Sequence, residues 1–190
     1  MTSIVVETTA IPAVLTIIPQ RFGDRRGFFS ETYNRKAFLE AGLDYDFVQD
    51  NHSRSSRGVL RGMHLQIGEG VAKLVRCARG EILDVIVDVR AGSPTYRRWQ
   101  AFTLDDRAHH QLFVPVGFAH GFCTLSDVAD VVYRQSGYYA PALERTIAYD
   151  DPELAIAWPP GIDFIVSERD AKARTLREQA DELRFGDPPA

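Results

Sequence analysis

One segment of the chain combines three side chains that together could move a proton on an anionic substrate. Residues Val59–Gln66 read V-L-R-G-M-H-L-Q, and Lys73 follows shortly after. His64 can accept or release a proton near neutral pH. Arg61 can hold a phosphate with two parallel hydrogen bonds, and Lys73 can stabilise negative charge that develops on an oxygen. The segment therefore predicts proton chemistry on a negatively charged substrate.

The distribution of charge is consistent with a small anionic ligand. The net charge of −4 argues against general nucleic-acid binding. Residues 51–80 nevertheless contain a single acid, Glu69, and six basic side chains, namely Arg54, Arg57, Arg61, Lys73, Arg76 and Arg79. A scattered, solvated basic surface is the alternative interpretation of this zone.

The elements that must position these side chains are strands. The segment 81–90 alternates between two faces: one face has Leu83, Val85, Val87 and Val89, and the other has Ile82, Asp84, Ile86, Asp88 and Arg90. Further short apolar runs occur at 14–18, 71–77, 111–116, 121–125 and 128–135, separated by Gly, Pro and Asp turns. Many short strands without long helices between them favour an all-β sandwich or barrel over a parallel βαβ fold.

Helices are expected only at the periphery. Asn34 can cap a helix over 35–41, and Ser167 can cap a C-terminal helix with Leu176, Ala180 and Leu183 along one side. We expect one domain over residues 1–190, with a β core over about 10–165 and a helical segment over about 167–185.

The remaining bulk features favour a cytoplasmic protein. No apolar run approaches the length of a membrane span, and residues 1–10 lack the pattern of a secretory signal. Cys77 and Cys123 lie inside apolar runs, so we expect buried free thiols rather than a disulfide or a metal site.

A second histidine lies in a recognisable context. The stretch Pro115–Phe122, which contains His120, resembles the second half-motif of cupin barrels. Metal-binding cupins usually supply His-x-His and a glutamate in the first half-motif, but the matching residues here are His64, Leu65 and Gln66. The expected ligand set is incomplete, so a metal-free barrel is predicted. A satisfied core residue is the alternative for either histidine taken alone.

An ordered series of motifs resembles the dTDP-4-dehydrorhamnose 3,5-epimerase family over about residues 10–175. The series comprises Arg26–Glu31, Phe47–Ser53, Arg61–Gln66, Lys73–Arg76, Asp84–Arg90, Ser93–Thr95 and Pro115–Phe122. The resemblance implies a cupin-type jelly roll that forms a homodimer and needs no cofactor. It also implies epimerisation of dTDP-4-keto-6-deoxyglucose at C3 and C5, next to the ketone, through an enolate.

The resemblance implies a role for four catalytic candidates. His64 matches the family's base and Asp170 its carboxylate partner, although Ser167 and Asp170 also have the spacing of a helix cap. Tyr133 matches the acid that returns a proton to the opposite face, and Lys73 matches a lysine near the keto oxygen. The alternatives are an ordinary strand aromatic for Tyr133 and a surface residue for Lys73.

The resemblance also implies a set of substrate-binding residues. Arg61 and Arg26 are candidates for the diphosphate and its neighbourhood, with surface ion pairs as the alternative. The other candidates match family positions around the nucleotide or the sugar, some of them contributed across the dimer: Phe29, Glu31, Gln49, Asn51, His120, Tyr139, Glu144 and Arg169. A purely structural role, in core packing or turn capping, is the alternative for several of them.

The chain departs from the family pattern at Leu65, in the loop 67–72 and in the turn 93–98. These departures leave open a C3-only or C5-only epimerase of a modified deoxysugar pathway. A non-catalytic sugar-nucleotide-binding cupin would keep the arginines but would need neither His64 nor Tyr133. A metal-dependent oxygenase would need bound iron.

Overall fold

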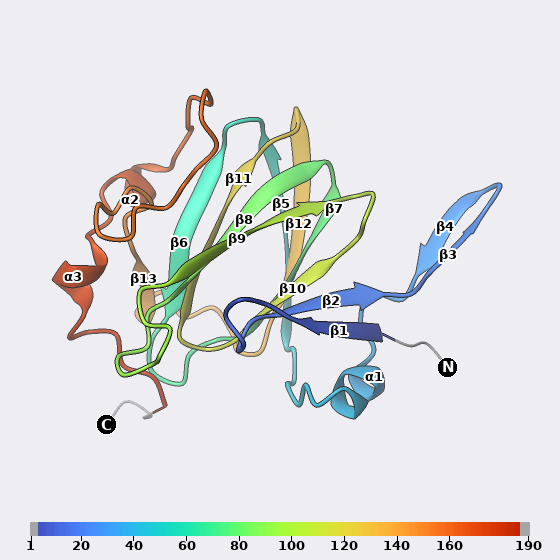
Figure 1. Cartoon of the computed structure of the whole chain (residues 1–190), viewed down its shortest axis with the longest axis horizontal. Helices are drawn as coiled ribbons and strands as arrows, with labels where there is room; N and C mark the ends of the chain where they lie inside the picture. The colour runs from blue at the N-terminus through green and yellow to red at the C-terminus, as the bar shows by residue number, and fades with distance from the viewer. Residues whose placement is uncertain (1–3, 187–190) are drawn as a thin grey trace.

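Two antiparallel sheets packed face to face form the body of the protein, as shown by a computed structural model that describes residues 4–186 (Figure 1). The first sheet has, in order, β1 (Ile4–Thr8), β2 (Leu15–Pro19), β10 (Gln111–Val114), β7 (Lys73–Arg79), β12 (Val128–Gln135) and β5 (Gln49–Ser56). The second has, in order, β13 (Glu144–Thr146), β6 (Leu60–Gln66), β11 (Phe118–Thr124), β8 (Glu81–Asp88) and β9 (Trp99–Asp105).

The connections between the sheets are those of a jelly roll. From β5 to β8 each successive strand lies in the other sheet, and the same exchange recurs from β9 to β13. Such crossing connections between two antiparallel sheets are typical of double-sheet jelly rolls. The prediction of a mainly β, cupin-type sandwich with few short helices is therefore confirmed.

Strand alternation places the apolar core between the two sheets. On β8, Ile82 and Ile86 point inward and pack with Leu112 and Val131 of the first sheet. Val85 belongs instead to a second cluster on the outer face of the second sheet. Both faces of β8 are thus buried, which explains why apolar residues occur on both of them.

The C-terminal segment covers that outer face, but not as one helix. It forms two short helices, α2 (Glu168–Ala171) and α3 (Leu176–Gln179), so the predicted continuous helix is wrong. Between them the chain is extended, because Arg174 makes a parallel bridge with Ile147. Thr175 then begins a new helix with its own capping box. Leu176 and Leu183 are buried nonetheless, as the pattern indicated.

The N-terminal helix is confirmed. α1 (Arg35–Glu40) begins after Asn34, whose side chain accepts hydrogen bonds from the backbone N–H groups of Lys36 and Ala37. Its Phe38 packs against the outer face of the first sheet. Cys77 and Cys123 are buried free thiols, as predicted. Within residues 4–186, no helix is both long and apolar enough to cross a membrane.

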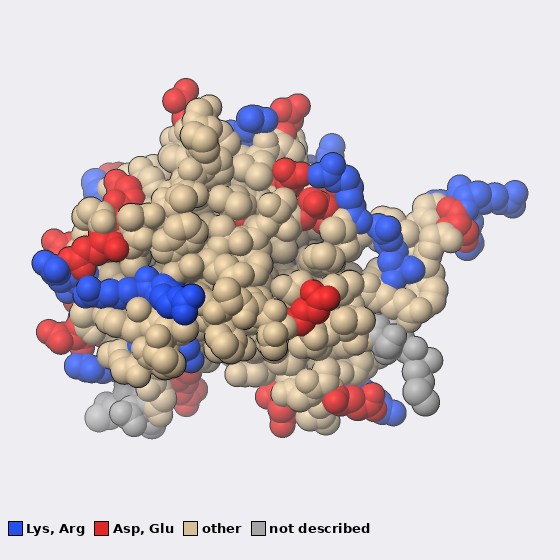
Figure 2. Space-filling model, viewed as in Figure 1, with Lys and Arg blue, Asp and Glu red and all other residues tan. Residues whose placement is uncertain are grey.

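A two-stranded hairpin projects away from the body. β3 (Arg21–Asp24) and β4 (Gly27–Ser30) pair only with each other and extend beyond the sandwich (Figure 1). Phe22, Phe28 and Phe29 are 50, 57 and 69 % exposed on it. Basic side chains gather on the same projection (Figure 2). A hairpin that exposes three aromatic rings beside arginines has the composition of a contact surface.

Candidate active site

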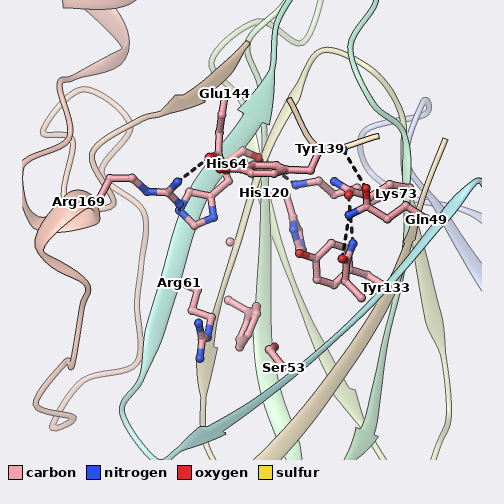
Figure 3. A pocket seen from close by; sticks show the side chains of 14 residues that line it. Gln49, Ser53, Arg61, His64, Lys73, His120, Tyr133, Tyr139, Glu144 and Arg169 are labelled. Atoms are coloured by element: carbon pink, nitrogen blue, oxygen red, sulfur yellow. Dashed lines mark hydrogen bonds and ion pairs between the residues drawn. The ribbon is translucent and has the colours of Figure 1, made fainter. Parts of the chain in front are cut away.

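A cavity of about 390 Å³ lies between the two sheets. Its wall is built mainly from β5, β7 and β12 of the first sheet and from β6, β11 and β13 of the second (Figure 3). The lining residues are Gln49, Asn51, Ser53, Arg61, His64, Lys73, His120, Gly121, Phe122, Tyr133, Gln135, Tyr139, Glu144 and Arg169. The fold therefore brings most of the predicted residues to one place.

His64 on β6 is paired with Asp170 on α2. The imidazole Nε2 lies 2.8 Å from Asp170 Oδ1, and Asp170 Oδ2 accepts a hydrogen bond from the Gly62 backbone N–H at 3.3 Å. The helix cap uses a different group, because the backbone N–H of Asp170, not its carboxylate, donates to Ser167 Oγ. Capping and histidine pairing are thus compatible, and the carboxylate remains available to His64.

The surroundings of His64 favour the neutral imidazole. Burial lowers the pKa of His64 below its usual 6.5, and the hydrogen bond and charge of Asp170 oppose this shift only in part. Arg169 Nη2 also approaches Nε2, at 2.9 Å. Both contacts are made to Nε2, so a ring that has its hydrogen on Nε2, directed at Asp170, has its free lone pair on Nδ1. A neutral imidazole with one nitrogen anchored and the other free can act as a base.

Lys73 is buried beside His64. Only 8 % of the residue is exposed, and its Nζ donates a hydrogen bond to the His64 backbone carbonyl at 3.2 Å. Burial lowers the pKa of Lys73 to about 8, while the negative charges of Asp84 and Glu144 act in the opposite direction. The ammonium form still predominates at neutral pH, so a positive charge is available inside the cavity.

Tyr133 faces His64 from the other sheet. It belongs to β12, whereas His64 belongs to β6, and the two side chains lie on different walls of the same cavity (Figure 3). Burial raises the pKa of the Tyr133 phenol above 10, so the hydroxyl remains protonated at neutral pH. A group that can accept a proton and a group that can donate one thus lie on different walls of one cavity.

The mouth of the cavity is held by a polar network. Glu144 Oε2 accepts hydrogen bonds from Tyr139 Oη at 2.8 Å and from Arg169 Nη1 at 2.6 Å. Gln49 Oε1 accepts from the backbone N–H of Tyr139 at 2.9 Å, and Gln49 Nε2 donates to Asn51 Oδ1 at 2.9 Å. Five predicted binding residues are therefore connected to one another around the opening.

Four predicted residues do not line this cavity, and one of them, Asp170, lies next to it as the partner of His64. Arg26 and Phe29 lie on the projecting hairpin, where Arg26 forms an exposed ion pair with Asp24. Glu31 follows the hairpin, and its buried Oε1 has no hydrogen-bond partner among residues 4–186. None of Arg26, Phe29 and Glu31 lines the cavity of its own chain.

The positions that depart from the family pattern also lie off the cavity wall. Leu65 packs in the apolar cluster on the outer face of the second sheet. Ser93 and Thr95 donate hydrogen bonds to the buried Asp88, at 2.6 Å in each case. None of Leu65, the loop 67–72 and the turn 93–98 lines the cavity.

The residue-by-residue prediction missed two polar groups. Gln135 lines the cavity and accepts a hydrogen bond from Asn51 Nδ2 at 3.1 Å. Asp84 is fully buried and lies 2.8 Å from Nε2 of His120, whose predicted place in the sugar pocket fits its position on the cavity wall. A signal for Asp84 was present, because it alternates with Ile82 and Ile86 on the face of β8 that points inward.

The described residues do not assemble a metal site. Within the range 4–186, no group of three or more His, Cys, Asp or Glu side chains is arranged to hold a metal ion.

Comparisons with known proteins identify the family. Residues 8–178 match the family model of dTDP-4-dehydrorhamnose 3,5-epimerase. The enzyme of that name from Pseudomonas aeruginosa is 48% identical over 170 residues, which are 89% of this chain and 94% of the relative. The enzyme of that name from Salmonella typhimurium is 48% identical over 174 residues, which are 90% of this chain and 95% of the relative.

Solved structures of epimerases resemble this chain over nearly its whole length. An epimerase from Legionella pneumophila in complex with dTDP-4-keto-L-rhamnose superimposes with a TM-score of 0.92 at 43% identity, over 96% of this chain and 99% of the other. A 3'-monoepimerase from Streptomyces bikiniensis, in complex with dTDP-quinovose, has a TM-score of 0.88 at 36% identity, over 94% of this chain and 92% of the other. The chain therefore belongs to the dTDP-4-dehydrorhamnose 3,5-epimerase family, a family of carbohydrate epimerases.

Proposed function

We propose that the protein epimerises dTDP-4-keto-6-deoxyglucose at C3 and C5. The observation that supports this best is the placement of His64 and Tyr133 on opposite walls of one cavity, with the Asp170 carboxylate on the anchored nitrogen of His64. Inversion of a carbon next to a ketone needs a base on one face and an acid on the other. The names of the relatives support inversion at both carbons, rather than a single-site reaction or binding alone.

The proposed reaction begins at His64. Nδ1 takes the proton from C3, and the electron pair of the broken C–H bond forms the enolate C=C bond while negative charge moves to the ketone oxygen. Asp170 stabilises the resulting imidazolium through Nε2–H. The carboxylate thus lowers the energy of a charge that exists only after proton transfer has begun.

Lys73 and Tyr133 complete the inversion. The Lys73 ammonium stabilises the enolate oxygen, because a preorganised charge in a buried site is most effective where charge develops. The Tyr133 phenol then gives its proton to C3 from the opposite face, and the C=O bond reforms. The imidazolium loses its proton and the tyrosinate regains one, so the protein returns to its starting state. The same sequence at C5 gives the second inversion.

We further propose that the protein acts as a cytoplasmic homodimer in which the hairpin completes the partner's cavity. Arg26 and Phe29 match family positions around the nucleotide, yet both lie on a projection away from their own cavity. Exposed aromatic rings next to arginines suit the base and the diphosphate of a nucleotide sugar.

A mixing experiment tests the dimer. We expect Arg26→Ala and His64→Ala to be weakly active or inactive alone. Mixed dimers would contain one cavity that has both native residues, so partial activity should return after the two variants are unfolded and refolded together. Activity that stays at the sum of the separate variants would refute a shared site, and sedimentation equilibrium would show whether a dimer forms.

Proton exchange tests the reaction itself. The protein is incubated with dTDP-4-keto-6-deoxyglucose in deuterated water, and the C3 and C5 protons are followed by NMR. We expect both signals to disappear and the rhamno-configured product to form. His64→Ala should abolish exchange at both carbons, and activity within tenfold of the native protein would refute its role as the base. His110→Ala is a matched control, because His110 lies outside the cavity in the loop between β9 and β10.

A further inference from the structure

A second carboxylate–histidine pair lies inside the barrel. Asp84 is on the inward face of β8, between Ile82 and Ile86, and is completely buried. Its Oδ2 lies 2.8 Å from Nε2 of His120, a residue of the cavity wall. Among residues 4–186 no donor reaches Oδ1. One oxygen of this carboxylate therefore contacts His120. The other oxygen accepts no hydrogen bond from residues 4–186.

The charge of such a carboxylate must be balanced nearby. A buried carboxylate is costly unless a positive group or several donors compensate it. His120 supplies only one hydrogen bond. Lys73 is the buried cation of the same cavity, and it is paired with a backbone carbonyl rather than with a carboxylate. The barrel thus holds a buried carboxylate and a buried ammonium group that form no direct ion pair with each other among residues 4–186.

We propose that Asp84 is a positioning residue of the epimerase: its buried carboxylate orients His120 and supplies the counter-charge that keeps Lys73 an ammonium ion in the cavity. The proposal rests on the proposed function for its catalytic consequence, but the protonation of Lys73 can be measured without substrate. Asp84 would act through Lys73 and His120 and would not touch the reacting atoms.

The sign of the effect follows from the charges around Lys73. Burial lowers its pKa, and Asp84 is the stronger of the two carboxylates that raise it, the other being Glu144. The other titratable or charged groups that line the cavity or act on Lys73 are Arg61 and His64 on β6, Asp84 on β8, His120 on β11, Tyr133 on β12, Tyr139, Glu144 on β13 and Arg169. Removal of the Asp84 charge should favour the neutral amine.

The lysine content of the chain makes a direct measurement feasible. The sequence contains three lysines, Lys36, Lys73 and Lys172. Lys36 and Lys172 have side chains that are 84 and 73 % exposed, and they serve as internal references. Protein labelled with [ε-¹³C]lysine is titrated by NMR. We expect Lys73 to titrate near pH 8 in the native protein and at a lower pH in Asp84→Asn, whereas the two references stay unchanged.

A matched control separates charge from structure. Asp88 is equally buried on the same strand, but its carboxylate is satisfied by Arg90, Ser93 and Thr95. We expect Asp88→Asn to lower stability without moving the Lys73 titration. If Asp84→Asn does not fold, Asp84→Ser removes the same charge with a smaller side chain and serves as the second variant.

Kinetics provide the catalytic readout. A fall in the pKa of Lys73 below its native value of about 8 lowers its ammonium fraction more at pH 8 than at pH 6.5. Asp84→Asn should show this pH-dependent loss. An unchanged Lys73 titration, or an equal loss at both pH values, would overturn the proposal. A native protein that shows the Lys73 titration but no epimerisation would instead refute the proposed function.

Discussion

Replacement of Asp170 by asparagine tests the central pair of the active site with minimal change in shape. Asp170 is 3 % exposed, and its carboxylate lies 2.8 Å from His64 Nε2. The amide keeps the size of the side chain but loses the charge that stabilises the imidazolium. An amide N–H can also donate to Nε2, which would place the ring proton on Nδ1 and leave no lone pair for the substrate.

The size of the effect follows from this contact. A hydrogen bond to a charged group contributes about 1.5–3 kcal/mol, and each 1.36 kcal/mol of transition-state stabilisation corresponds to tenfold in rate. The loss of the charged partner alone should therefore lower kcat by roughly 10- to 160-fold, and the wrong tautomer would lower it further. The acidic limb of the pH profile of Asp170→Asn should lie at lower pH than that of the native protein, because Asp170 raises the pKa of His64.

The assay is loss of the C3 proton in deuterated water, with product formation measured in parallel. Ser167→Ala is the control, because it removes only the hydroxyl that accepts from the Asp170 backbone N–H. We expect that variant to lose about 1 kcal/mol of stability and to keep most of its activity. A kcat of Asp170→Asn within threefold of the native value would refute the assignment of Asp170 as the partner of the base.

Two further outcomes are expected. Tyr133→Phe should retain exchange of the C3 proton better than it retains product formation, because it removes the acid but leaves the base; equal loss of both would contradict the opposed arrangement. The pH profile of kcat/KM in the native protein should be bell-shaped. The acidic limb should lie below 6.5, where His64 becomes protonated and ceases to act as a base, and the alkaline limb near 8, where Lys73 loses its charge. An alkaline limb near 10 would exclude Lys73 as the group responsible.

Local patterns predicted the elements that depend on neighbours in sequence. The alternation over 81–90 gave the strand β8, and Asn34 gave the start of α1, because both signals act within a few residues. The C-terminal helix was predicted as continuous because apolar spacing was the only signal available. Its interruption depends on the pairing of Arg174 with Ile147, a contact between segments far apart in the chain.

The sequence by itself determined the inventory of chemistry: a histidine, a lysine and a tyrosine on strands, a carboxylate after a helix cap, and an ordered set of motifs that resembles one family. Only the tertiary structure decided which of these groups meet. Asp170 reaches His64 across 106 positions of the chain, and Tyr133 faces His64 because their strands lie in opposing sheets. Asp84 joined the site for the same reason, since it contacts His120 only where β8 and β11 pair. The type of a side chain determines which chemistry it can perform. Long-range strand register and sheet packing determine which other groups it contacts.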